Sequence, residues 1–282
     1  MTPNERLGAV TGYVSMMRPG NCIMGAAGVL LAAIICLEHG DLLDYALELV
    51  LSAVVVMAFT GAGNSLNDYF DRELDRSAHP SRPIPRGLVS PSGAIAASAI
   101  LFSVAAALGF MIGTVSFVIV IASLAVMLAY EILLKSEGLV GNLAISWLTG
   151  ALFLFGGAAV GSLDLAWILA LLAFLATLGR EIAKDIQDME GDRGSRMTLP
   201  MRIGAGRAGV VASLSLVSAV ALSPAPYLLS LLSAWYLPVV AVADAIFIYS
   251  SLILFRNPER GQNMVKVAML LSLLAFLSGG IL

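Results

Sequence analysis

Residues 44–75 read DYALELVLSAVVVMAFTGAGNSLNDYFDRELD, an apolar run that ends in a group of carboxylates. An α-helix needs roughly 20 apolar residues to cross the hydrocarbon core of a membrane, and the run over 44–66 is long enough. Similar runs recur along the chain, at 21–38, 92–112, 115–134, 142–161, 164–182, 207–228, 234–255 and 264–281. We therefore expect an all-α polytopic membrane protein with about nine transmembrane helices, built as one domain over residues 1–282.

The composition favours the same environment. Hydrophobic residues make up 59% of the chain and charged residues only 12%, whereas soluble proteins carry roughly 25% charged residues. The formal net charge is -3, and nucleic-acid binding would require a basic patch. We expect the chain to have membrane lipids around it and no nucleic-acid partner.

The basic residues divide the connections between the predicted spans into two kinds. With nine spans, every Lys and Arg falls on one side of the membrane, at positions 6, 18, 72, 76, 82, 86, 135, 180, 184, 193, 196, 202, 207, 256, 260 and 266. The opposite connections carry acids instead, namely Glu38, Asp41, Asp44 and Asp164. Because basic residues remain in the cytoplasm, this predicts a multi-pass cell-membrane protein with a cytoplasmic N-terminus and an outside C-terminus. The two long connections, 67–91 and 183–206, are then cytoplasmic.

Both long connections begin with aspartates at the same spacing. The two sets are Asp68, Asp71 and Asp75, and then Asp185, Asp188 and Asp192. Residues at i, i+3 and i+7 share one face of a helix, and Asn64 continues the first face by one turn. Carboxylates this close repel one another unless a cation lies among them, and magnesium prefers oxygen ligands. One acidic cluster at a membrane surface is usually a solvated, ion-paired loop, but two copies with identical spacing favour a pair of magnesium sites.

Paired clusters of this kind suit a diphosphate substrate. Magnesium ions between carboxylates and a diphosphate neutralise the charge that develops as the C–O bond of the leaving group breaks. An apolar helical bundle would admit a prenyl tail and keep the resulting allylic cation away from water. Neighbouring basic residues are candidates to complete the diphosphate site, namely Arg72, Lys135, Arg180 and Lys184. Tyr130 and Asn142 flank Lys135 and are candidates to line the mouth of the cavity.

Four motifs resemble, in chain order, those of the UbiA superfamily of intramembrane prenyltransferases. They are Arg18-Pro-Gly-Asn21, Asn64 to Asp75, Arg82-Pro-Ile-Pro-Arg-Gly87 and Asp185 to Asp192. The resemblance implies nine helices around a lipid-open central cavity with a cytoplasmic cap, and Mg2+ as the cofactor. It also implies that the six aspartates are catalytic and bind the metal. The residues it places at the substrates are Arg18, Asn21, Asn64, Asn67 and Lys135.

The segment Arg180–Asp192, followed by Thr198-Leu-Pro200, is most similar to one branch of that superfamily. Its members transfer a geranylgeranyl group from its diphosphate to geranylgeranylglyceryl phosphate in archaeal ether-lipid synthesis. The resemblance thus implies a prenyl diphosphate donor and a lipid acceptor. A relative that prenylates an aromatic acceptor such as 4-hydroxybenzoate would carry nearly the same aspartates, so this alternative stays open.

Other classes fit the pattern less well. A cation transporter would place its ion sites near the middle of the bilayer on broken helices, whereas these clusters lie at helix ends. A phospholipid-alcohol phosphotransferase would need an Asp-Gly-xx-Ala-Arg lead-in, and a soluble isoprenyl synthase would not have nine apolar runs. Asp244, inside a predicted span, has either a functional role or a hydrogen bond to a neighbouring helix.

Overall fold

The computed structural model describes residues 3–37, 42–191 and 197–281, and these residues form helices and turns without any strand. Within this part of the chain, nine helical segments are long and apolar enough to cross a membrane. They are Pro19–Cys36, Leu42–Phe70, Pro91–Ile112, Thr114–Leu134, Leu139–Ala159, Asp164–Asp188, Ala205–Leu228, Tyr236–Ile253 and Pro258–Gly280. The predicted all-α fold and the number of spans are confirmed.

Contacts divide the chain into two compact units. The N-terminal unit comprises Met1–Leu30 and Asp41–Ile132, and the C-terminal unit comprises Leu31–Gly40 and Leu133–Leu282. A single domain over the whole chain stays a prediction.

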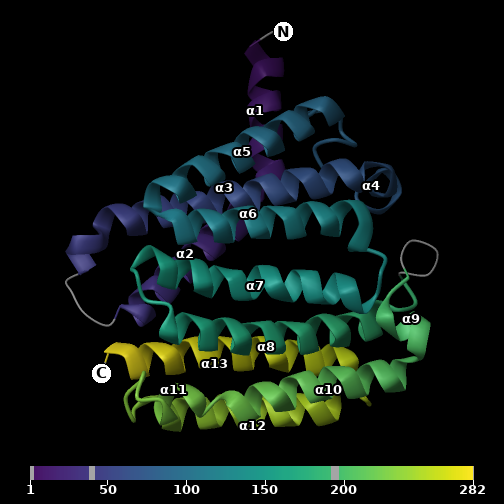
Figure 1. Cartoon of the computed structure of the whole chain (residues 1–282). Helices are drawn as coiled ribbons and strands as arrows, with labels where there is room; N and C mark the ends of the chain where they lie inside the picture. Colours follow the sequence, from purple (N-terminus) through teal and green to yellow (C-terminus); the bar gives the residue numbers. More distant parts are fainter. Residues whose placement is uncertain (1–2, 38–41, 192–196, 282) are drawn as a thin grey trace. The chain divides into compact units, whose positions relative to one another are not determined.

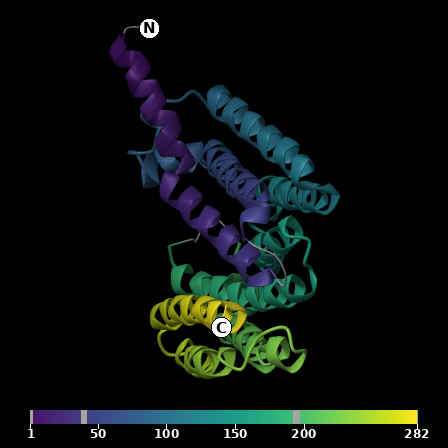
Figure 2. The same ribbon diagram turned by 90° about the vertical axis from the view of Figure 1, so that its left-hand side faces the viewer.

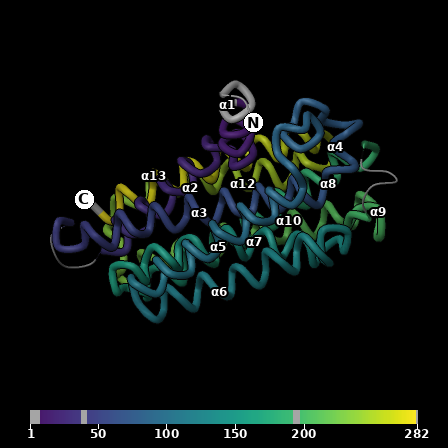
Figure 3. Tube along the Cα trace, turned by 90° about the horizontal axis from the view of Figure 1, so that it is seen from above, coloured from purple at the N-terminus to yellow at the C-terminus, as the bar shows by residue number. Residues whose placement is uncertain are grey.

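The N-terminal unit is built around α3 (Ala46–Phe70), which packs against α5 (Pro91–Ile112) and α1 (Pro3–Met17). Figures 1 and 3 show α3 and α5 side by side, with α6 (Thr114–Ala129) next to α5. Phe59 and Phe102 meet edge to face across the α3–α5 contact, with ring centroids 5.1 Å apart. Ser98 of α5 donates to the carbonyl of Ala62 at 3.0 Å. These contacts fix the end of α3, which carries the first aspartate cluster.

Two boundaries differ from the sequence prediction. The polar N-terminal stretch forms α1, and the chain then breaks at Arg18 before α2 (Pro19–Cys36), as the two ribbons in Figure 2 show. The predicted span over 164–182 continues as one helix, α8, to Asp188, because polar residues extend it beyond its apolar part. The span over 207–228 contains Pro224 and Pro226 near its end, and α10 (Ala205–Leu222) stops before the short α11 (Ala225–Leu228).

The C-terminal unit surrounds α8 (Asp164–Asp188), which packs against α7 (Leu139–Ala159), α10 and α13 (Pro258–Ile281). Figure 1 shows α13 beside α12 (Tyr236–Ile253), the other large contact of this unit. Small residues allow the close approach. A Cβ on Gly150 would lie 2.8 Å from the carbonyl oxygen of Ala170, and one on Gly179 would meet Leu216 at 2.7 Å. Close packing of this kind positions the second aspartate cluster at the end of α8.

Asp244 has a structural partner. The hydroxyl of Ser223, at the end of α10, donates to Oδ2 of this α12 carboxyl group at 2.6 Å. Tyr236 donates from its hydroxyl to the carbonyl of Ser223 at 2.7 Å and stacks on Phe276 of α13. Of the two roles considered for Asp244, the hydrogen bond to a neighbouring helix is therefore observed.

Candidate functional site

Arg18 lies at the break between α1 and α2, with a φ of 53°. A residue other than glycine rarely adopts this left-handed backbone conformation, which costs of order 1–3 kcal/mol and persists only where surrounding contacts hold it. Here Asn64 donates to the carbonyl of Met17 at 2.9 Å. Arg18 in turn donates to Asn64 Oδ1 at 3.4 Å and to Asp68 Oδ1 at 2.5 Å. The strained break thus aims the Arg18 guanidinium at the first aspartate cluster.

The first cluster spans the end of α3 and the start of α4 (Arg72–Ala78). Asp68 and Asp75 are each only 2% exposed, while Asp71 is half-buried at the turn between the helices. Arg82, from the connection to α5, donates to Asp75 Oδ2 at 2.5 Å and lies 3.5 Å from Asp68 Oδ1. Nδ1 of His79 lies 3.2 Å from Asp75 Oδ1. Two members of the predicted cluster therefore share Arg82, which belongs to the third motif but was not among the predicted site residues.

Two further residues meet at the opening of the cluster. The amide of Asn67 donates to Oε1 of Glu131 at 3.1 Å. Glu131 is buried and belongs to η2 (Tyr130–Leu134), a π-helical turn that follows α6 and begins with the predicted Tyr130. Such turns are frequent at functional sites. Sequence reasoning missed Glu131, although a lone acid in an apolar run is a reason to suspect a function.

The first cluster has the ligands that magnesium requires. Two buried carboxylates converge on one guanidinium nitrogen, which is where a divalent cation would compensate their charge. Within the described ranges no group of three His, Cys, Asp or Glu side chains is arranged to hold a metal. Magnesium is commonly held by one or two carboxylates plus substrate phosphates, so the donor set fits a metal that arrives with its diphosphate.

The second cluster lies on the last turns of α8 and is contacted from α7. The amide of Asn142 donates to Asp185 Oδ2 at 3.0 Å, so two residues predicted from the sequence meet in the C-terminal unit. Asp188 is half-buried and is the last residue of the helix. Asp192, the third predicted aspartate, lies outside the described residues.

The predicted cationic and polar residues have varied surroundings. Arg180 pairs with Glu181, and the side chain of Lys184 is exposed on α8. Lys135 is half-buried directly after η2. Asn21 is exposed on the first turn of α2, where its backbone N–H donates to the carbonyl of Arg18 at 2.9 Å. The roles of all these residues toward a substrate stay predictions.

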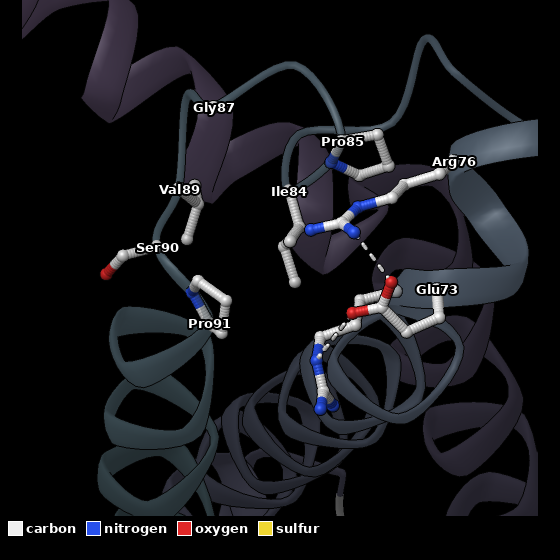
Figure 4. A pocket seen from close by; sticks show the side chains of 9 residues that line it. Glu73, Arg76, Ile84, Pro85, Gly87, Val89, Ser90 and Pro91 are labelled. Carbon is white, nitrogen blue, oxygen red and sulfur yellow. Dashed lines mark ion pairs between the residues drawn. The ribbon is translucent and has the colours of Figure 1, made fainter.

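Arg72 faces a cavity beside the first cluster. The cavity has a volume of about 390 Å³ and lies between α4 and the connection that leads to Pro91 (Figure 4). Arg72 donates to the carbonyl of Tyr69 at 2.8 Å and lies over its ring, 4.5 Å from the centroid. Figure 4 shows the Glu73 carboxylate between two guanidiniums, with the Arg76 pair at 2.7 Å. Glu73 and Arg76 are exposed, whereas Asp75 of the same helix is buried.

Comparison with known proteins identifies the family. The UbiA prenyltransferase family matches residues 26–275. Digeranylgeranylglyceryl phosphate synthase of Methanothermobacter thermautotrophicus is 40% identical over 273 residues, which cover 95% of each chain. The same enzyme of Natronomonas pharaonis is 40% identical over 273 residues, covering 96% of this chain and 97% of the relative.

Solved structures agree with this family. A structure of digeranylgeranylglyceryl phosphate synthase in membranes has a TM-score of 0.87 and 33% identity, covering 97% of this chain and 99% of the other. A UbiA homolog from Archaeoglobus fulgidus bound to GPP and Mg2+ has a TM-score of 0.71 and 16% identity, covering 95% and 98%. This second likeness concerns the fold alone. The chain belongs to the UbiA prenyltransferase family and is a multi-pass membrane prenyltransferase.

Proposed function

We propose that this protein transfers a geranylgeranyl group from its diphosphate to geranylgeranylglyceryl phosphate, in a magnesium-dependent reaction of archaeal ether-lipid synthesis. The observation that carries the choice of acceptor is the 40% identity, over 95% of each chain, to an enzyme named for the product of that transfer. The buried Asp68 and Asp75 at the end of a membrane span support the metal dependence.

The reaction replaces one C–O bond by another. The allylic C–O bond of the donor breaks, and pyrophosphate leaves with the electron pair. The acceptor hydroxyl oxygen forms the new ether bond, and its proton passes to a carboxylate or to the released pyrophosphate. An allylic cation is electrophilic enough for a neutral hydroxyl, so the site needs no strong base.

The chain's own residues have three tasks in this scheme. The aspartates of both motifs hold the magnesium, which would supply charge stabilisation for the leaving diphosphate. Lys135, Arg180 and Lys184 are proposed to bind diphosphate oxygens directly. Apolar side chains of the spans keep water from the allylic cation, which would otherwise be hydrolysed.

A second anion has to be accommodated, because the acceptor also carries a phosphate. We propose three basic residues for this phosphate, namely Arg18, Arg193 and Arg202. Arg202 pairs with Glu137 at 2.8 Å and would exchange this carboxylate for the phosphate, whereas Arg18 would bind the phosphate while it keeps its contact to Asp68. Arg193 lies outside the described residues.

The proposal is tested with the purified protein in nanodiscs, supplied with geranylgeranyl diphosphate, Mg2+ and one acceptor at a time. Mass spectrometry is expected to detect digeranylgeranylglyceryl phosphate from the lipid acceptor, and EDTA is expected to abolish it. Prenylation of 4-hydroxybenzoate alone would overturn the ether-lipid assignment. The fold and the family would be unaffected by that result.

The orientation in the membrane is part of the same proposal. We propose that the N-terminus and both aspartate motifs face the cytoplasm, because the basic residues of the chain follow the positive-inside pattern. The donor and the acceptor phosphate would then both be reached from the cytoplasmic side.

A further inference from the structure

Arg82 is held against the first aspartate cluster by a folded connection. Its backbone N–H donates to the carbonyl of His79 at 3.0 Å, and its own carbonyl accepts from the N–H of Arg86 at 3.1 Å. Pro83 is buried, so the turn is anchored on the unit. The side chain of Arg82 is 26% exposed, whereas the two aspartates that it contacts are almost fully buried. The Arg82 guanidinium therefore lies between two carboxylates that are almost inaccessible to water.

Asp68 and Asp75 each have a cationic partner already. Arg18 lies 2.5 Å from Asp68, and Arg82 lies 2.5 Å from Asp75. Burying a carboxylate is costly unless it has such a partner. A metal ion that bound both Asp68 Oδ1 and Asp75 Oδ2 would have to take the place of Arg82 Nη1, which lies 3.5 Å from the first oxygen and 2.5 Å from the second. Metal binding to these carboxylates therefore requires a guanidinium to withdraw.

Arg82 is the guanidinium that can withdraw. It is the one whose Nη1 lies near both carboxylates, at 2.5 Å from Asp75 and 3.5 Å from Asp68. Arg18 is fixed by a strained backbone and a second contact to Asn64. A diphosphate carries about three negative charges, so it can accept the guanidinium that the carboxylates release.

We infer that Arg82 occupies the place of a metal ion in the absence of substrate, where it pairs with Asp68 and Asp75. When magnesium binds these two aspartates, Arg82 moves to the diphosphate. The inference rests on the proposed function and adds to it a diphosphate-binding residue and a coupling between metal and diphosphate binding. Without diphosphate, the metal ion competes with Arg82 for the carboxylates of Asp68 and Asp75, and it therefore binds weakly. The metal and the diphosphate together bind well, because the released guanidinium gains a phosphate partner.

The test measures metal binding directly, by the electron paramagnetic resonance signal of Mn2+ with the protein in nanodiscs. It compares wild type, Arg82→Gln and the matched control Arg86→Gln, which removes the same charge from an exposed side chain of the same connection. With Mn2+ alone, Arg82→Gln is expected to bind about tenfold more tightly than wild type, or about 1.4 kcal/mol. With Mn2+ and inorganic pyrophosphate together, Arg82→Gln is expected to bind more weakly than wild type. Arg86→Gln is expected to have the affinity of wild type under both conditions.

Three results would contradict the inference. Equal Mn2+ affinity in wild type and Arg82→Gln would mean that Arg82 only ties the connection to the helices. Tighter Mn2+ binding without any loss of Mn2+–pyrophosphate binding would rule out transfer to the diphosphate. If wild type binds neither Mn2+ nor Mn2+–pyrophosphate, the magnesium dependence of the proposed function fails, and this inference with it.

A measurement on wild type makes the test independent of whether Arg82→Gln folds. Phenylglyoxal modifies accessible guanidiniums, and mass spectrometry quantifies Arg82 with Arg86 as the internal reference. Saturating Mg2+ is expected to increase modification of Arg82, and Mg2+ with pyrophosphate is expected to suppress it. Modification that does not change with Mg2+ would overturn the inference.

Discussion

Asp68 lies in the last turn of the membrane helix α3 and is almost fully buried. Its nearest cation is Arg18, at 2.5 Å. Removing Arg18 would leave Asp68 with the more distant Arg82, at 3.5 Å. Weakening the compensation of a buried charge is more costly than losing an exposed pair. The stability of the N-terminal unit should therefore depend on Arg18.

We expect Arg18→Gln to lower the free energy of unfolding by about 1–3 kcal/mol, the cost of a buried polar group that loses its partner. Arg76→Gln is the matched control, because its pair with Glu73 is exposed on both sides and such pairs contribute about 0–1 kcal/mol. Thermal unfolding in detergent, without added metal, compares the two. An equal loss in both variants would contradict the role assigned to Arg18.

Residue spacing predicted the aspartates but not their partners. Asp68, Asp71 and Asp75 could be grouped from the sequence because neighbours on one helix face have a fixed period. Arg82 and Glu131 could not, since their contacts to this helix end span 14 and 64 residues of chain. Such contacts depend on how connections and neighbouring helices pack, and no local pattern encodes that.

At the scale of the helix, an acid inside a span requires a donor from another element. Ser223 supplies it for Asp244. We expect Ser223→Ala to destabilise the protein by about 1–3 kcal/mol, because the carboxyl group would lose its hydrogen bond in an apolar surrounding. Ser272→Ala is the control, since Ser272 donates only to its own helix, to the carbonyl of Ala268 at 3.0 Å. Similar melting temperatures for the two variants would argue against the interhelical role.

The start of α5 offers a second test at this scale. Ser90 caps the helix by accepting from the N–H of Gly93 at 3.0 Å, and Pro91 follows it. We expect Ser90→Ala to cost about 1 kcal/mol of stability. Ser103→Ala, an exposed serine within the same helix, should cost much less. Thermal unfolding measures both, and a larger loss for Ser103→Ala would contradict the assignment of the cap.

The apolar runs predicted which segments are helical, but they did not predict where each helix begins and ends. The apolar runs set the spans because a membrane helix must be apolar for about 20 residues. The polar α1 and the polar last turns of α8 have no such requirement. The contact of α1 with α3 supports its helix. The end of α8 could be expected to be helical only from the spacing of its aspartates, not from its hydropathy.

For the whole molecule, the distribution of basic residues predicts one orientation. We expect a reporter fused after Leu282 to be outside the cell and one inserted in the connection 79–90 to be inside, because basic connections stay cytoplasmic. The nine spans in the described part of the chain make these two locations opposite. A cytoplasmic reporter after Leu282 would contradict the orientation and would require another number of spans.

The central claim is that the aspartates of each motif are required for the magnesium-dependent release of pyrophosphate from the donor. Pyrophosphate release with geranylgeranyl diphosphate and geranylgeranylglyceryl phosphate tests it most directly, in wild type, Asp68→Asn, Asp188→Asn and the exposed control Glu73→Gln. Loss of one such charge-stabilising group is worth about 2.7–4 kcal/mol, so kcat should fall about 10²–10³-fold in each aspartate variant. Glu73→Gln should retain the wild-type rate. Wild-type rates in either aspartate variant at saturating Mg2+, with the protein folded, would contradict the account.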